Sequence, residues 1–310
     1  MLLAQAASAQ DYPAKSVRLI AAAAPGGNPD VLARMLAAKL AESFGRPFVV
    51  ENVPGAGGVV AAEAVARSAP DGYVLMLGDS GAMAINVALN PKVPYHPLKD
   101  FTLITALAAV PTVLVANPSV PAASLQDFVF LAKGQPGKFS YGSAGNGSVH
   151  HLTMAVFASR AGLDMLHVPY KGGTALVAAV LSGEVQSGWS GIPNVLAHIR
   201  AGKLKVYAIS TAQRSSTLPD VPTAAEAGIK GYTSAAWFAF LGPRGTPRPI
   251  VDKVYKDVAA AMADPIVRNR FIEFGAEPLA TTPEQLGKYI SSEIVKWRDI
   301  ITKAGITLEQ

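Results

Sequence analysis

The segment that decides the fold is Lys138–Leu152, KFSYGSAGNGSVHHL, where a strand pattern gives way to a helix pattern. Alternating residues from Lys138 to Tyr141 predict a strand that ends at Gly142. Three glycines and two serines then occupy seven residues, and an apolar-periodic run from Val149 predicts a helix. The segment therefore reads as strand, small-residue loop and helix, the repeating unit of an α/β protein.

The small-residue loop Gly142–Ser148 is suited to an anion. Asn146 or Ser148 can cap the helix, whose first N–H groups have no partner within it. Glycines let a ligand approach the backbone, and the positive helix end favours negative charge. No Lys follows Gly145, so the loop is not a Walker-type phosphate loop. We interpret it as a seat for a carboxylate, with an ordinary turn as the alternative.

Composition limits the class of protein. The chain has 310 residues, 50% of them hydrophobic and 16% charged, which indicates a folded protein with room for two domains. The net charge is +5, but the basic residues are scattered without interleaved aromatic residues, which argues against a nucleic-acid partner. The absence of cysteine excludes disulfides, thiolate metal sites and a cysteine nucleophile. We predict neither a cofactor nor a metal site.

The first residues resemble the end of a secretory signal. Ala7-Ser8-Ala9 supplies the small-x-small cleavage pattern, so residues 1–9 are expected to be a signal-peptide remnant cleaved near Ala9. No later stretch reaches the 18 or so apolar residues that a membrane span needs. We therefore expect an exported, soluble protein.

Two βα series follow, and the last third of the chain is expected to be helical. Strands are predicted at residues 17–23, 48–51 and 73–77, with two short ones at 102–107 and 112–116 before the second series. Small-residue loops follow strands in both series: Pro25–Asn28, Gly78–Gly81, Gly142–Ser148 and Ser190-Gly191. In parallel α/β sheets, ligands bind outside the carboxyl ends of strands. Two lobes that each present such an edge would form a cleft.

Ser80 lies in a pattern close to the nucleophile elbow of hydrolases, Gly78-Asp79-Ser80-Gly81-Ala82. A serine hydrolase also needs a histidine base, and none of the five histidines is an evident candidate. Ser80 therefore fits better as a hydrogen-bond donor to a ligand or as the start of a helix.

The order of several motifs resembles the Bug family, the periplasmic solute-binding proteins of tripartite tricarboxylate transporters. The resemblance covers nearly the whole chain from Tyr12. It rests on Ala24–Arg34, Val50–Gly58, Ala69–Tyr73, Pro94–Phe101, Gly142–Ser148, His167–Gly172, Leu218–Thr223 and Gly242–Pro247.

The resemblance implies an α/β protein of the two-lobed periplasmic-binding-protein (Venus flytrap) type. Each lobe would be a mostly parallel sheet flanked by helices, with residues 10–112 and 235–310 in lobe 1 and 113–234 in lobe 2. The expected function is capture of a small carboxylate in the periplasm and its delivery to the large and small membrane subunits of the transporter. No catalytic residue is implied. A sensing role, with a sensor kinase ectodomain as partner, stays open.

The family's binding loops correspond to three sets of residues in this sequence. In lobe 1 they are Pro25, Gly26, Gly27, Asn28, Asp79 and Ser80. In lobe 2 they are Ser143, Ala144, Gly145, Asn146, Gly147 and Ser148, followed by Trp189 and Ser190. Relatives often carry an acidic residue at Ser190, which would pair with an ammonium group. Its absence favours a dicarboxylate or aromatic acid over an amino acid, with Trp189 as a stacking wall. The Asp79 charge is expected to oppose a carboxylate unless it points away. His150 and His151 are expected on a helix surface or in the core. Lys171 could face the cleft or solvent, and solvent is favoured.

Overall fold

One long strand, β4 (Phe101–Ala116), runs through both halves of the molecule. The structure is a computed structural model that describes residues 12–230 and 233–307; the expected signal remnant lies outside these residues. The other strands are β1 Val17–Ala21, β2 Phe48–Asn52, β3 Val74–Asp79, β5 Phe139–Ser143, β6 Met165–Pro169, β7 Ser187–Gly191, β8 Lys205–Ile209, β9 Ala235–Pro243 and β10 Glu277–Pro278. The α-helices are α1 Asn28–Phe44, α2 Val59–Ala66, α3 Asn86–Leu89, α4 Leu125–Lys133, α5 Val149–Ala161, α6 Gly173–Ser182, α7 Ile192–Arg200, α8 Arg248–Ala263, α9 Pro265–Glu273 and α10 Pro283–Ala304.

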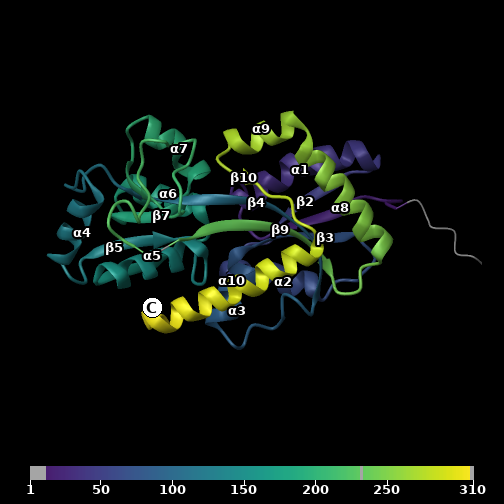
Figure 1. Ribbon diagram of the computed structural model, residues 1–310, viewed down its shortest axis with the longest axis horizontal. Coiled ribbons are helices and arrows are strands. Elements are labelled where there is room, and N and C mark those ends of the chain that lie inside the picture. The colour runs from purple at the N-terminus through teal and green to yellow at the C-terminus, as the bar shows by residue number, and fades with distance from the viewer. Residues whose placement is uncertain (1–11, 231–232, 308–310) are drawn as a thin grey trace, which may run out of the picture.

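The first lobe is built on β2, β1 and β3, which are parallel neighbours. β9 lies next to β3 and is antiparallel to it, and the first part of β4 pairs antiparallel with the other edge of β9. Figure 1 shows α1, α8 and α9 on one face of these strands and α2, α3 and α10 on the other. The βα order places the loops after β1, β2 and β3 at one edge of the sheet.

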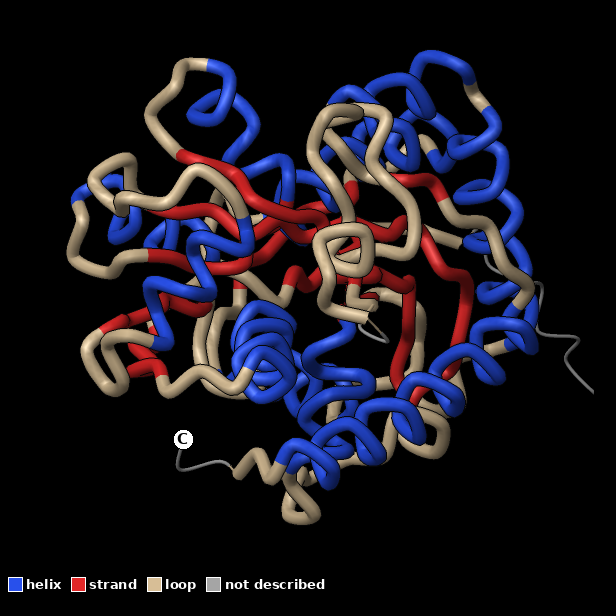
Figure 2. Tube along the Cα trace, turned by 60° about the vertical axis from the view of Figure 1, so that its left-hand side comes forward, coloured by secondary structure: helices blue, strands red, loops and turns tan. Residues whose placement is uncertain are grey.

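The second lobe repeats this plan. β6, β5 and β7 are parallel neighbours, and the last part of β4 pairs antiparallel with β7 and β8. Helices α4 to α7 belong to this half of the molecule (Figure 1). Figure 2 shows the same layering from another side, with the strands inside and the helices around them. The α/β fold expected from the sequence is confirmed.

β4 differs from the two short strands expected between residues 102 and 116, because it is continuous through Pro111. Pairing with β9 ends at Pro111, opposite Ala235, and pairing with β7 begins at the next residue, Thr112, opposite Gly191. Proline has no N–H to donate, so it is tolerated at the point where one partner strand replaces another. Ser210 fixes this point, since its Oγ lies 2.7 Å from Thr112 Oγ1.

Helix α1 begins without a side-chain cap. Its N-cap residue is Gly27, and Pro29 lies in its first turn. Asp30 Oδ2 instead accepts a hydrogen bond from Gly26 N at 2.9 Å and holds the preceding turn. At the other end of α1, Gly45 supplies the left-handed C-cap.

No helix in the described part of the chain is long and apolar enough to cross a membrane.

Candidate functional site

A cavity of about 430 Å³ lies between the two lobes. Its walls are the loops that follow β1, β2 and β3 in the first lobe and β5 and β6 in the second, and Asn194 in the first turn of α7 and Ala236 and Phe238 of β9 also line it. These five loops and the start of α7 stand at carboxyl ends of parallel strands, where α/β folds bind ligands. The lining residues are Ala22–Ala24, Gly27–Pro29, Pro54–Gly58, Asp79–Gly81, Ala144, Gly145, Ser148–His150, Tyr170–Thr174, Asn194, Ala236 and Phe238.

Four α-helices begin at this cavity, namely α1, α5, α6 and α7. In α5, Ser148 is the N-cap and accepts a hydrogen bond from His151 N at 3.2 Å, as one of the two sequence alternatives predicted. The other three begin without a side-chain cap. Their first N–H groups have no partner within the helix and carry partial positive charge, so the cavity is suited to an anion.

Two buried polar atoms of the first lobe lack partners at the cavity wall. Ser80 is 1% exposed and Asn28 is 5% exposed. Neither Ser80 Oγ nor Asn28 Oδ1 has a hydrogen-bond partner in the described residues. An unmet buried polar atom is costly, so a ligand that reaches these atoms would recover that free energy.

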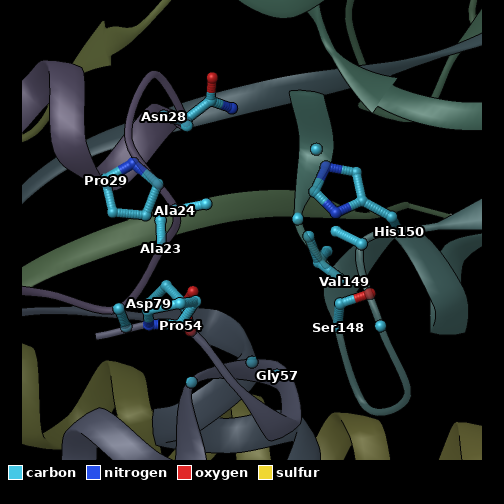
Figure 3. A pocket seen from close by; sticks show the side chains of 18 of the residues that line it. Ala23, Ala24, Asn28, Pro29, Pro54, Gly57, Asp79, Ser148, Val149 and His150 are labelled. Atoms are coloured by element: carbon cyan, nitrogen blue, oxygen red, sulfur yellow. The ribbon is translucent and has the colours of Figure 1, made fainter. Parts of the chain in front are cut away.

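Asp79 is the last residue of β3 and lines the cavity (Figure 3). Its Oδ1 accepts a hydrogen bond from Ala82 N at 2.9 Å, which ties the carboxylate to the helical turn that follows. Burial raises the pKa of Asp79 to about 6, although backbone donors at Ala82 and Gly81 act in the opposite direction. The carboxyl group is therefore largely protonated only below pH 6, and near neutral pH most of the charge expected to oppose an anionic ligand is still present.

The glycine-serine loop of the second lobe divides into lining and supporting residues. Ala144, Gly145 and Ser148 line the cavity. Ser143 instead supports the loop from beneath, because its Oγ lies 2.7 Å from His167 Nε2 and accepts a hydrogen bond from Gly145 N at 3.1 Å.

Asn86, in α3 of the first lobe, joins three loops at one end of the cavity. Its Nδ2 donates to the carbonyl oxygens of Gly57 (3.2 Å), Gly81 (3.0 Å) and Gly147 (3.1 Å). Gly147 belongs to the second lobe, so this one side chain holds the lobes together. A side chain at Gly147 would collide with Asn86, and its φ of +71° also favours glycine.

The residues expected to bind ligand fall into two groups. Those that line the cavity are Gly27, Asn28, Asp79, Ser80, Ala144, Gly145 and Ser148. Those that do not line it are Pro25, Gly26, Ser143, Asn146, Gly147, Trp189 and Ser190.

Trp189 and Ser190 lie in β7, which is covered by α5 on one side and α6 on the other. Both are fully buried, and Trp189 packs edge-to-face on Phe157 with ring centroids 5.9 Å apart. Trp189 is thus a core residue and not a stacking wall. Ser190 does not line the cavity either. The absence of an acidic residue at this position therefore no longer argues against amino-acid ligands.

Some lining residues were not singled out from the sequence. Pro54–Gly58 is a small-residue loop after the strand predicted at residues 48–51, so it shows the same pattern that identified the other loops. Tyr170–Thr174 shows that pattern only at Gly172 and Gly173. His150, expected on a helix surface or in the core, lines the cavity, and so does Lys171, whose side chain is exposed. No sequence pattern around Asn194, Ala236 or Phe238 indicated that these residues line the cavity.

Two α/β lobes that share a cavity lined by helix N-termini are typical of periplasmic solute-binding proteins. The model of the tripartite tricarboxylate transporter receptor family, TctC, matches residues 32–306. The chain belongs to this family.

Named relatives agree with this assignment. Protein BugT of Bordetella pertussis is 37% identical over 99% of this chain and 94% of its own. Among solved structures, Rpa4515 of Rhodopseudomonas palustris with adipate has a TM-score of 0.93 at 34% identity, covering 96% of this chain and 99% of that one. MatC (Rpa3494) of Rhodopseudomonas palustris with bound malate has a TM-score of 0.89 at 35% identity, covering 94% of this chain and all of that one.

Proposed function

We propose that this protein captures a small carboxylate, either a dicarboxylate or an aromatic acid, between its lobes. It would then deliver the acid in the periplasm to the large and small membrane subunits of a tripartite tricarboxylate-type transporter. The observation that carries this proposal is the cavity on which α1, α6 and α7 begin without side-chain caps. Backbone N–H groups at helix starts make charge-assisted hydrogen bonds to carboxylate oxygens.

The chemistry of the lining supports an acid with an apolar body. Ala22–Ala24, Pro29, Val149 and Phe238 give the cavity apolar walls between the polar ends of its loops. The adipate and malate of the two solved relatives are both small dicarboxylates, which supports the same class for this chain.

Binding would close the lobes by population shift. In the lobe boundaries that we propose, residues 12–112 and 235–307 form one unit and 113–234 the other, with the chain crossing at β4 and before β9. A ligand that contacts both walls only in the closed form stabilises that form by the difference in contacts.

A thermal-shift screen tests the function. The panel holds aliphatic di- and tricarboxylates including adipate and malate, benzoate-type acids, pyridine carboxylates, and acidic amino acids with their amides. A ligand at a hundred times its Kd adds about 2.7 kcal/mol to the free energy of unfolding, which gives a clear rise in Tm. Mass spectrometry of the denatured protein controls for an acid that co-purifies.

The outcome separates the alternatives. A rise only with amino acids would contradict the plain-carboxylate proposal and would indicate that Asp79 pairs with an ammonium group. A serine-reactive phosphonate that labels Ser80 would instead support a hydrolase. The sensing alternative gains no support from the family or from the relatives described above.

A further inference from the structure

The histidine pair at the start of α5 divides between the cavity and the core. His151 points beneath the loop, where its Nδ1 accepts a hydrogen bond from Gly147 N at 3.3 Å and its ring stacks on His167 at 4.1 Å. His150 instead lines the cavity, on the wall opposite Pro29 and Asp79 (Figure 3). Neighbouring residues of a helix are rotated by about 100°, which accounts for the difference.

Both ring nitrogens of His150 are buried, and neither has a hydrogen-bond partner in the described part of the chain. A neutral imidazole carries one donor and one acceptor, and leaving both unmet is costly. The ring lines the cavity, so a bound ligand would meet the two nitrogens once the ring turns toward it.

Few titratable side chains other than His150 line the cavity and could pair with an acidic group of the ligand. The titratable side chains that line it besides His150 are Asp79, Tyr170 and Lys171. Tyr170 donates its hydroxyl to Glu184 at 2.9 Å, and Lys171 is exposed to solvent. An acidic group placed against His150 therefore meets no buried cation unless the imidazole itself becomes one.

The elements packed on α5 differ in the titratable side chains that they carry. β7 and the π-helix Gly81–Ile85 carry none. Tyr141 of β5 stacks on His167 of β6, which in turn stacks on His151. α10 carries three ion pairs, namely Glu284 with Lys288, Glu293 with Lys296 and Asp299 with Lys303, besides Tyr289 and Arg298.

We propose that His150 contacts a second acidic group of the ligand and takes up one proton from solvent as that ligand binds. This inference rests on the proposed function and assigns the residue that selects diacids over monoacids. Burial lowers the pKa of His150 to about 4, so the ring is neutral near pH 7 before binding. An adjacent carboxylate favours the imidazolium form, which then donates a charge-assisted hydrogen bond.

The sign of the pH dependence follows from this proton uptake. Where the complex holds one more proton than the separate partners, Kd rises by up to about tenfold for each unit by which the pH is raised. Diacids should therefore bind more tightly at pH 6 than at pH 8, whereas monoacids seated on the first lobe should change less.

Titration calorimetry in phosphate and in Tris at pH 7 counts the protons, because the two buffers differ in ionisation heat. The probes are the dicarboxylates from succinate to suberate, each paired with the monocarboxylate of equal length. The proteins are the wild type, His150→Gln, Asp79→Asn and the control His198→Gln, whose residue lies in α7 outside the cavity lining. We expect uptake of up to one proton per diacid, retained in His198→Gln and lost in His150→Gln together with most of the preference for diacids.

Several results would overturn the inference. Diacid binding without proton uptake would overturn it while leaving the receptor function intact, as would binding of monoacids alone. Loss of uptake in Asp79→Asn but not in His150→Gln would assign the proton to Asp79. If neither the dicarboxylates nor the monocarboxylates bind, and no acid in the thermal-shift panel raises the Tm, the receptor function itself is overturned.

Discussion

Ser80 and Ser187 make a matched pair of buried hydroxyls. Neither Oγ has a hydrogen-bond partner in the described residues, but Ser80 lines the cavity whereas Ser187 lies in β7 away from it. A hydrogen bond to a charged group contributes about 1.5–3 kcal/mol. We expect Ser80→Ala to weaken carboxylate binding about ten- to a hundredfold with little loss of stability, because its hydroxyl is unmet in the free protein. Titration calorimetry would measure the loss of affinity. An equal loss of affinity in Ser187→Ala would contradict the role of Ser80 as a ligand contact.

Asp79 makes stability depend on pH. Its folded pKa is raised from 3.8 to about 6, so the native state holds more protons than the unfolded state between these values. The free energy of unfolding should therefore fall as pH rises from 4 to 6, by roughly 2 kcal/mol from this group. Urea unfolding of the wild type and Asp79→Asn across this range tests it. Parallel pH profiles for the two proteins would show that Asp79 is not the cause.

Among the elements, the three loops joined by Asn86 act as one unit. Asn86→Ala removes donors to Gly57, Gly81 and Gly147 and leaves the contact between lobes weaker. We expect about a tenfold rise in Kd, in line with the loss of about 1.4 kcal/mol of closed-state stability. The control is Asn90→Ala, which removes only a local bond to Lys92 N. Equal affinities for the two variants would contradict the role given to Asn86.

The sequence predicted local structure better than contacts between elements. The Ser148 cap and the loops at strand ends were predictable because each depends on residues close in the chain. Asn86 was missed because its acceptors lie as far as 61 residues away. Trp189 was misplaced because a strand covered by helices on both faces buries every side chain, so alternation gives no indication of which residues face a ligand.

At the scale of the whole molecule, lobe approach depends on Gly191. This residue ends β7 in the second lobe and faces Asn28 of the first, so a Cβ there would collide with Asn28 Nδ2. We expect Gly191→Ala to hold the lobes apart, weakening binding at least tenfold while each lobe stays folded. Small-angle scattering with saturating ligand would show a larger radius of gyration than in the wild type. Gly134→Ala is the control, because its Cβ meets no atom closer than 3.5 Å; an identical scattering curve for the two variants would contradict the prediction.

The pairing of β9 with β3 and β4 also sets the order in which the chain can fold. As the chain emerges from its N-terminus, β3 and β4 appear first, but the strand that lies between them begins only at Ala235. Until then the first lobe has open strand edges, which invite pairing with other chains. Residues 113–234 can complete their own sheet during that interval, with β4 already available to them. The second lobe is therefore positioned to fold first, and the chain stays vulnerable to aggregation until β9, in its last quarter, has been delivered.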